Sequence, residues 1–152
     1  MPRRTELSSL ETHLGYWIRY VSNHVSHAFA LKLEAHAVTV AEWVVLRDLY
    51  DRESAPSAIA ERLGMTRGAI SKLAERLIDK ELIVRRATAR DRRFQSLALT
   101  PQGRAITPKL AALADENDAK FFADLDIETR ATIVAAMKAI VRRKGLRGAP
   151  VD

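Results

Sequence analysis

Apolar residues recur three or four positions apart over most of the chain. The first such stretch runs from about Leu7 to His36 and contains no proline. Because this spacing places the apolar side chains on one stripe of a helix, we predict one long N-terminal helix. The stripe is too wide for a helix that contacts only its own domain, so part of it is expected to pack against a second chain.

Capping residues predict further helices on both sides of the middle of the chain. Thr39 is expected to cap a helix over 40–50, and Thr100 a helix that runs toward Phe122, since a Thr hydroxyl accepts hydrogen bonds from the first backbone N–H groups of a helix. Apolar residues again have helical spacing over about 127–143, which predicts a last helix. The chain is therefore expected to be mainly α-helical.

The middle of the chain matches a helix-turn-helix. Residues 56–73, PSAIAERLGMTRGAISKL, follow its spacing without a gap, with the small Ala60 where two helices cross and Gly64 in the turn between them. Apolar residues that would hold the helices in place are Ile59, Leu63, Met65, Ile70 and Leu73. In this motif the second helix is presented to the major groove of DNA. An ordinary helical hairpin has a similar sequence, so the motif alone leaves both interpretations open.

Two short strands are predicted directly after this motif, over 82–86 and 96–99. The segment that connects them, ATARDRRFQ, contains Arg90, Arg92 and Arg93. Such a loop suits contacts with the phosphate backbone or with a narrow minor groove, although a charged loop standing alone is more often simply solvated. Its place behind a helix-turn-helix favours a winged helix with a two-stranded β wing.

The distribution of charge supports a polyanionic partner. The chain has 25 Lys and Arg against 19 Asp and Glu, a net charge of +6, and residues 56–100 contain ten of the basic against five of the acidic residues. Neutralising DNA phosphates releases condensed counterions, so a basic cluster of this kind is typical of proteins that bind DNA. We therefore expect double-stranded DNA as a partner.

Composition argues against several other classes of protein. With 152 residues, 47% of them hydrophobic, the chain is long enough for one well-packed domain. It has no run of about 18 apolar residues and no pattern of a signal peptide, so we expect a cytoplasmic protein without a membrane partner. The absence of cysteine excludes disulfides and thiolate metal sites.

No pattern in the sequence indicates catalysis. The chain has no GxGxxG, Walker, GxSxG or HExxH motif, and its four histidines all precede Val38. His24 and His27 have a spacing that could hold one ion, but no acidic or thiolate ligand complements them. We predict no enzyme, no catalytic residue, no metal site and no cofactor.

Helical phase selects the residues that would read DNA. Ile70, Leu73 and Leu77 should face the core, which turns the other side of the helix outward. The predicted recognition surface consists of Thr66, Arg67, Gly68, Ser71 and Lys72. Arg67 is suited to a bidentate contact with guanine, Arg76 one turn further along suits a phosphate, and Thr66 is equally well explained as an N-cap.

The order of elements resembles the MarR (multiple antibiotic resistance regulator) family of dimeric transcription factors. The residues that carry the resemblance are PSAIAERLGMTRGAISKLAERLIDKELIVRR at 56–86, DRR at 91–93 and LTPQG at 99–103. The chain departs from the family pattern at Thr88, where many members have Asp, and at Glu81, where Gly commonly ends the recognition helix.

The resemblance implies how the chain is divided. Residues 1–37 would form an N-terminal dimerisation helix, 38–100 the winged helix-turn-helix, 101–145 the C-terminal dimerisation helices and 146–152 a frayed tail, all in one compact domain. It also implies a homodimer that binds a pseudo-palindromic operator, with an arginine of each wing in the minor groove.

Members of this family often bind small aromatic or phenolic compounds between the dimer helices and the winged domain. Here the aromatic and histidine side chains His13, Trp17, Tyr20, His24 and Trp43 would line such a site. Trp and His on an apolar stripe are, however, more often packed in a dimer interface than in contact with a ligand. The sequence thus predicts a transcription regulator, as a repressor released by an aromatic ligand, and the alternative is a winged-helix scaffold that binds proteins instead of DNA.

Overall fold

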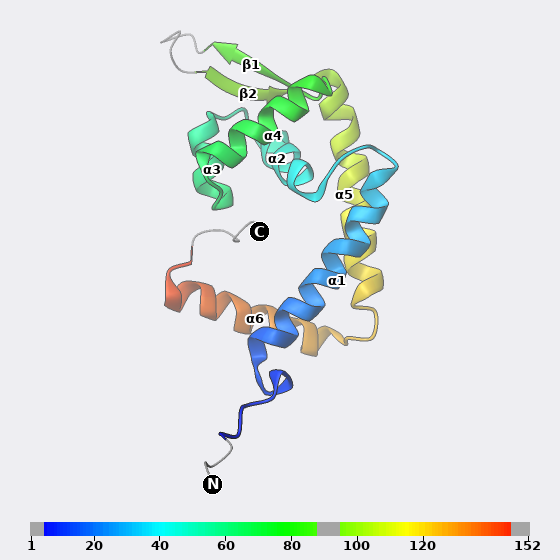
Figure 1. Ribbon diagram of the computed structural model, residues 1–152. Coiled ribbons are helices and arrows are strands. Elements are labelled where there is room, and N and C mark those ends of the chain that lie inside the picture. The colour runs from blue at the N-terminus through cyan, green and yellow to red at the C-terminus, as the bar shows by residue number, and fades with distance from the viewer. Residues whose placement is uncertain (1–4, 88–94, 147–152) are drawn as a thin grey trace.

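The computed structural model describes residues 5–87 and 95–146, which form helices and one two-stranded antiparallel sheet. In chain order the elements are η1 (Leu10–Thr12), α1 (Leu14–Glu34), α2 (Val40–Asp51), α3 (Pro56–Leu63), α4 (Arg67–Asp79), β1 (Ile83–Ala87), β2 (Gln95–Leu99), α5 (Pro101–Phe121) and α6 (Ile127–Lys144). The sheet and α2–α4 lie at one end, α1 and α5 run side by side away from them, and α6 lies at the far end (Figure 1). The predicted mainly helical fold with a two-stranded wing is confirmed.

The long N-terminal helix begins later than the apolar period predicts. It starts at Leu14 and not at Leu7, because Ser9 accepts a hydrogen bond from the backbone of Glu11 and begins the separate turn η1. His13, in extended conformation (φ −93°, ψ 122°), then separates η1 from α1. Local hydrogen bonds of Ser thus replace the helix that hydrophobic spacing alone favours.

Three helices begin with the expected kind of cap. Thr39 forms a capping box with Glu42: the Thr39 hydroxyl accepts from the Glu42 backbone N–H (3.1 Å), and the carboxylate accepts from the Thr39 N–H (3.2 Å). Thr100 accepts from the Gly103 N–H at the start of α5. Asp126 caps α6 in the same way. The predicted helix at 40–50 extends one residue further, to Asp51, and the last helix ends at Lys144.

The wing strands pair from Ile83 opposite Leu99 to Ala87 opposite Gln95. The first strand lies one residue later than the predicted 82–86, and the second begins one residue before the predicted 96–99 and ends where predicted. Backbone hydrogen bonds in both directions also join Ser54 to Leu97 (Ser54 N to Leu97 O 3.1 Å, Leu97 N to Ser54 O 2.8 Å). The segment before α3 therefore holds the root of the wing.

The core lies where the C-terminal end of α1, the helices α2, α3 and α4, the sheet and the first half of α5 meet. Its fully buried apolar side chains are Leu33, Leu46, Leu49, Ile59, Ile70, Leu77, Ile83, Leu97, Leu110 and Val45. By contrast, α6 buries none of its residues. The large apolar side chains left exposed on α1 and α6 are Leu14, Trp17, Ile18, Tyr20, Val21, Leu31, Ile127, Ile133, Val134, Met137, Ile140 and Val141. None of the described helices is both long and apolar enough to cross a bilayer.

Candidate nucleic-acid interface

The turn of the helix-turn-helix is made by Gly64. Its backbone is left-handed (φ 66°, ψ 26°), a conformation that glycine adopts at little cost. The N–H of Met65 then donates to the carbonyl of Ala60, whose side chain is buried between the helices. The roles predicted for Ala60 and Gly64 are confirmed.

The second helix of the motif, α4, buries one face and exposes the other. Ile70, Leu73 and Leu77 are buried as predicted. The six residues predicted to face DNA from this helix are all exposed, namely Thr66, Arg67, Gly68, Ser71, Lys72 and Arg76. Their exposure is consistent with a recognition face, and their contacts with bases or phosphates stay predictions.

Thr66 caps α4. Its hydroxyl accepts a hydrogen bond from the backbone N–H of Ala69 (3.1 Å). This bond satisfies one of the N–H groups that a helix start leaves without an intrahelical partner. The cap accounts for a hydroxyl residue at this position whether or not Thr66 also contacts DNA.

Three of the basic side chains counted as DNA-binding charge form ion pairs with carboxylates of the same chain. The Arg62 guanidinium donates to both carboxylate oxygens of Asp48 (3.0 and 2.7 Å) and to the Ser54 hydroxyl (2.7 Å). The hydrogen bonds with Asp48 raise the pKa of Arg62 further above its already high value. Lys80 pairs with Glu42 (2.7 Å) and Arg86 with Glu53 (3.5 Å).

Three of the remaining basic side chains lie on α4. Within residues 5–87 and 95–146, no ion pair is formed by Arg67, Lys72 or Arg76. Since these three side chains are exposed on the same helix, they are the basic groups of α4 that are best placed for a phosphate or a base edge.

The tip of the predicted wing lies outside the described residues. This applies to Arg90, Arg92 and Arg93, the three arginines expected to reach DNA, and to Thr88. The root of the wing is described: the Glu53 carboxylate accepts a hydrogen bond from the Ser96 hydroxyl and pairs with Arg86.

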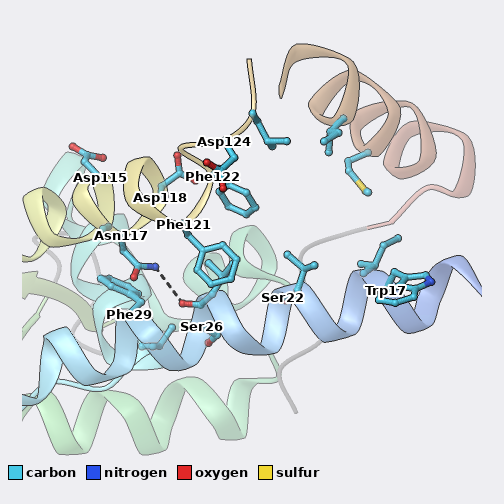
Figure 2. Close-up of a pocket in the computed structure, with 18 residues that line it drawn as sticks. Trp17, Ser22, Ser26, Phe29, Asp115, Asn117, Asp118, Phe121, Phe122 and Asp124 are labelled. Atoms are coloured by element: carbon cyan, nitrogen blue, oxygen red, sulfur yellow. Dashed lines mark hydrogen bonds between the residues drawn. The ribbon is translucent and has the colours of Figure 1, made fainter. Parts of the chain in front are cut away.

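A groove of about 1030 Å³ lies away from the wing, between α1, α5 and α6 (Figure 2). Of the five residues predicted to bind an effector, only Trp17 lines it. His13 occupies the N-cap position of α1 without a side-chain hydrogen bond to the helix, and Tyr20 stacks on His24 with ring centroids 5.0 Å apart. Trp43 packs edge-on against Phe29 in the core at 6.1 Å. The structure therefore does not bring the predicted set together around this groove.

Sequence reasoning missed the polar residues of the groove. Asn117 on α5 is 4% exposed, donates to the Val25 carbonyl (3.2 Å) and accepts from the Lys32 ammonium group (3.2 Å). Figure 2 shows Asp115, Asp118 and Asp124 near it, and Asp118 pairs with Arg130. Nothing in the spacing along α1 indicates which residues of α5 lie opposite. Among the described residues there is no cluster of three potential metal ligands.

Comparison with known proteins points to one family. Residues 37–93, which contain the helix-turn-helix, match the model of the MarR family. Over 87 residues the chain is 31% identical to a putative transcriptional regulatory protein for the hcr operon of Thauera aromatica, a match that covers 57% of this chain. The match spans 52% of that relative, about half of its length.

Solved structures show the same fold. The chain is similar to S. aureus MepR in complex with DNA, with a TM-score of 0.80 and 24% identity over 86% of this chain and 98% of that one. It is also similar to the organohalide-sensing regulator RdhR in its 2,4-dichlorophenol-bound form, with a TM-score of 0.82 and 16% identity over 94% of this chain and 86% of that one.

Proposed function

Because the chain belongs to the MarR family of winged helix-turn-helix regulators, we propose that it binds operator DNA and regulates transcription as a homodimer in the cytoplasm. The observation that carries this proposal is α4, which buries Ile70, Leu73 and Leu77 and exposes Arg67 and Lys72 on its other side. A helix held in this way can enter a major groove with its basic face toward the bases. The family is one of transcription regulators and not of enzymes.

The proposed dimer is supported by the apolar surface of α1 and α6. On α6, Ile133, Val134, Met137 and Ile140 are each about 40% exposed, and the helix buries none of its residues within the chain. Several large apolar side chains exposed to water on neighbouring elements mark a site of association. Two copies joined there would present two α4 helices, as a pseudo-palindromic operator requires.

DNA binding is tested with the upstream intergenic duplex of the protein's own gene and a scrambled duplex of equal composition, by fluorescence anisotropy across a salt series. Arg67→Ala should lose about tenfold or more in affinity for the upstream duplex and little for the scrambled one. Lys72→Ala should weaken both and reduce the salt slope by about one. Lys138→Ala, an exposed lysine of α6 at the end far from the wing, is the matched control. Equal weak binding of both duplexes, unaffected by either change, would instead favour the protein-binding scaffold.

We further propose that the protein is a repressor released by a small aromatic ligand in the groove between α1, α5 and α6. Its walls combine the aromatic rings of Trp17, Phe29 and Phe121 with the amide of Asn117 and the carboxylate of Asp124. Carboxylates repel anions and accept hydrogen bonds, so a neutral phenol that donates its hydroxyl suits this groove better than an aromatic acid. The relative with bound 2,4-dichlorophenol has the same fold.

Release is tested by adding 2,4-dichlorophenol, as a probe, to the complex of the protein with its upstream duplex. The probe should release DNA from the wild type but not from Ser22→Trp, which fills the groove from α1. Asn23→Trp, on the same helix but not in the groove, is the control. Release that Ser22→Trp leaves unchanged would contradict a ligand at this place.

A further inference from the structure

One lysine ties the C-terminal end of α4 to the corner between α1 and α2. Lys80 is the C-cap of α4, and its Nζ donates to Glu42 Oε2 (2.7 Å), to Glu42 Oε1 (3.0 Å) and to the backbone carbonyl of Ala37 (2.6 Å). All three bonds reach elements about 40 residues earlier in the chain. An ammonium group has three N–H donors, so Lys80 has none left for a phosphate.

The partner of this lysine is a buried carboxylate. Glu42 is 1% exposed, and besides Lys80 it accepts the Thr39 N–H in the capping box of α2. A carboxylate that is removed from water must be matched by nearby donors, and here one lysine supplies the charge. Burial and the capping box fix the carboxylate, and the Lys80 side chain, which is 36% exposed, reaches it from the surface.

The chain leaves both α1 and α4 through a residue with left-handed backbone. Ala37 (φ 53°) and Glu81 (φ 60°) are the two non-glycine residues with positive φ in the described part of the chain. The Ala37 carbonyl accepts from Lys80, and Glu81 follows Lys80 directly, with its own carbonyl bound by the Thr100 hydroxyl (2.6 Å). In both places this is the common left-handed ending of a helix: the Val38 N–H donates to the Leu33 carbonyl (3.5 Å) after α1, and the Leu82 N–H donates to the Leu77 carbonyl (2.9 Å) after α4. Lys80 therefore links two helix ends whose backbone is itself held by hydrogen bonds.

We propose that Lys80 is a positioning residue, which fixes the angle between α4 and α1 through Glu42 and Ala37 and thereby sets the spacing of the two recognition helices in the dimer. The inference rests on the proposed function, because α1 carries part of the apolar surface through which the second copy attaches. Two half-sites on DNA are separated by a fixed number of base pairs, so the two α4 helices must keep a fixed separation. If the α1–α2 corner could bend, the separation of the two α4 helices would vary.

The variant that tests this role removes the ion pair between Lys80 and Glu42 without leaving a buried charge. Lys80→Met keeps the length of the side chain, and Glu42→Gln keeps an acceptor for the Thr39 N–H, so the double variant E42Q/K80M retains the cap and has no orphaned ion. Lys138→Met is the control for loss of one exposed lysine. Cooperative thermal unfolding of the wild type, E42Q/K80M and Lys138→Met checks that each of these proteins folds.

The first readout needs no DNA. The chain has no cysteine, so Asn23→Cys on α1 and Glu75→Cys on α4 can be spin-labelled, and dilution with unlabelled protein restricts the measured distances to one chain. We expect a narrow distribution of α1–α4 distances without further changes and a clearly broader one with E42Q/K80M. Equal widths would overturn the positioning role, whatever the DNA experiment gives.

The second readout uses a duplex that the wild type binds specifically and derivatives with one base pair inserted or deleted between the half-sites. The wild type should lose about tenfold in affinity for the altered spacings. E42Q/K80M should lose most of this discrimination while its salt slope stays the same. A role in stability alone would lower the melting temperature and leave the discrimination intact, which would contradict the proposal. Failure of the wild type itself to prefer any duplex would instead contradict the proposed function.

Discussion

Gly103 has no room for a side chain. It lies buried in the first turn of α5, where an added Cβ would stand 2.0 Å from the carbonyl oxygen of Leu82 and 3.0 Å from its carbonyl carbon. The same oxygen accepts a hydrogen bond from the Thr100 N–H (3.1 Å). Gly103→Ala therefore forces the backbone that leads into the wing away from the start of α5.

The cost follows from three contributions. Overpacking of a well-packed site costs about 1–3 kcal/mol, and a backbone obstacle justifies the upper value. Weakening the bond between Thr100 and Leu82 adds about 1 kcal/mol. Alanine recovers about 1 kcal/mol through its higher helix propensity. The free energy of unfolding should thus fall by about 3 kcal/mol, which for a chain of this size lowers the melting temperature by about 6–12 °C.

Thermal and urea unfolding followed by circular dichroism measure this change. The matched control is Gly15→Ala in α1, where an added Cβ would have no heavy atom within 4 Å. Helix propensity then acts alone, and Gly15→Ala should melt at or above the temperature of the wild type. A Gly103→Ala protein that melts like Gly15→Ala would refute the steric argument.

Two further predictions concern charge. Arg62→Met should lower the free energy of unfolding by about 2 kcal/mol in urea, because it leaves the mostly buried Asp48 carboxylate without its partner. Arg47→Met, whose pair with Asp51 is about half exposed, should change it by less than about 0.5 kcal/mol, and equal effects would contradict this reasoning. Hydrogen bonds with Thr129 lower the pKa of Asp126, so this cap stabilises α6 above the ordinary pKa of 3.8, and its contribution is lost as the pH falls below that value. Asp126→Asn should flatten the acid side of a melting-temperature profile, and an unchanged slope would exclude Asp126 as its source.

The helix-turn-helix was predictable because its signals are local. The spacing of Ile59, Ile70 and Leu73 and the glycine at position 64 act within one short segment, and the structure places each of them as the pattern predicts. The start of α1 was not predictable from the same kind of pattern. Apolar spacing continues through Leu7 and Leu10, and one serine hydrogen bond decides against a helix there.

The parts of the site that depend on residues far apart in the chain could not be predicted from the sequence. Counting charges assigned Arg62 and Lys80 to DNA, but their partners Asp48 and Glu42 lie 14 and 38 residues away. The predicted effector residues were chosen along α1 and α2, whereas Asn117 and the carboxylates of Asp115 and Asp118 reach the groove from α5. Helical phase tells which face of one helix is buried and cannot tell which helix covers it.

Selection of bound duplexes from a random DNA library tests sequence-specific binding by α4 most directly. The wild type should enrich a pseudo-palindromic sequence with half-sites about one helical turn apart. Arg67→Ala should enrich the same sequence with one base pair of each half-site relaxed. A folded wild type that enriches no sequence, or an Arg67→Ala protein that enriches an identical one, would contradict readout of DNA through this face.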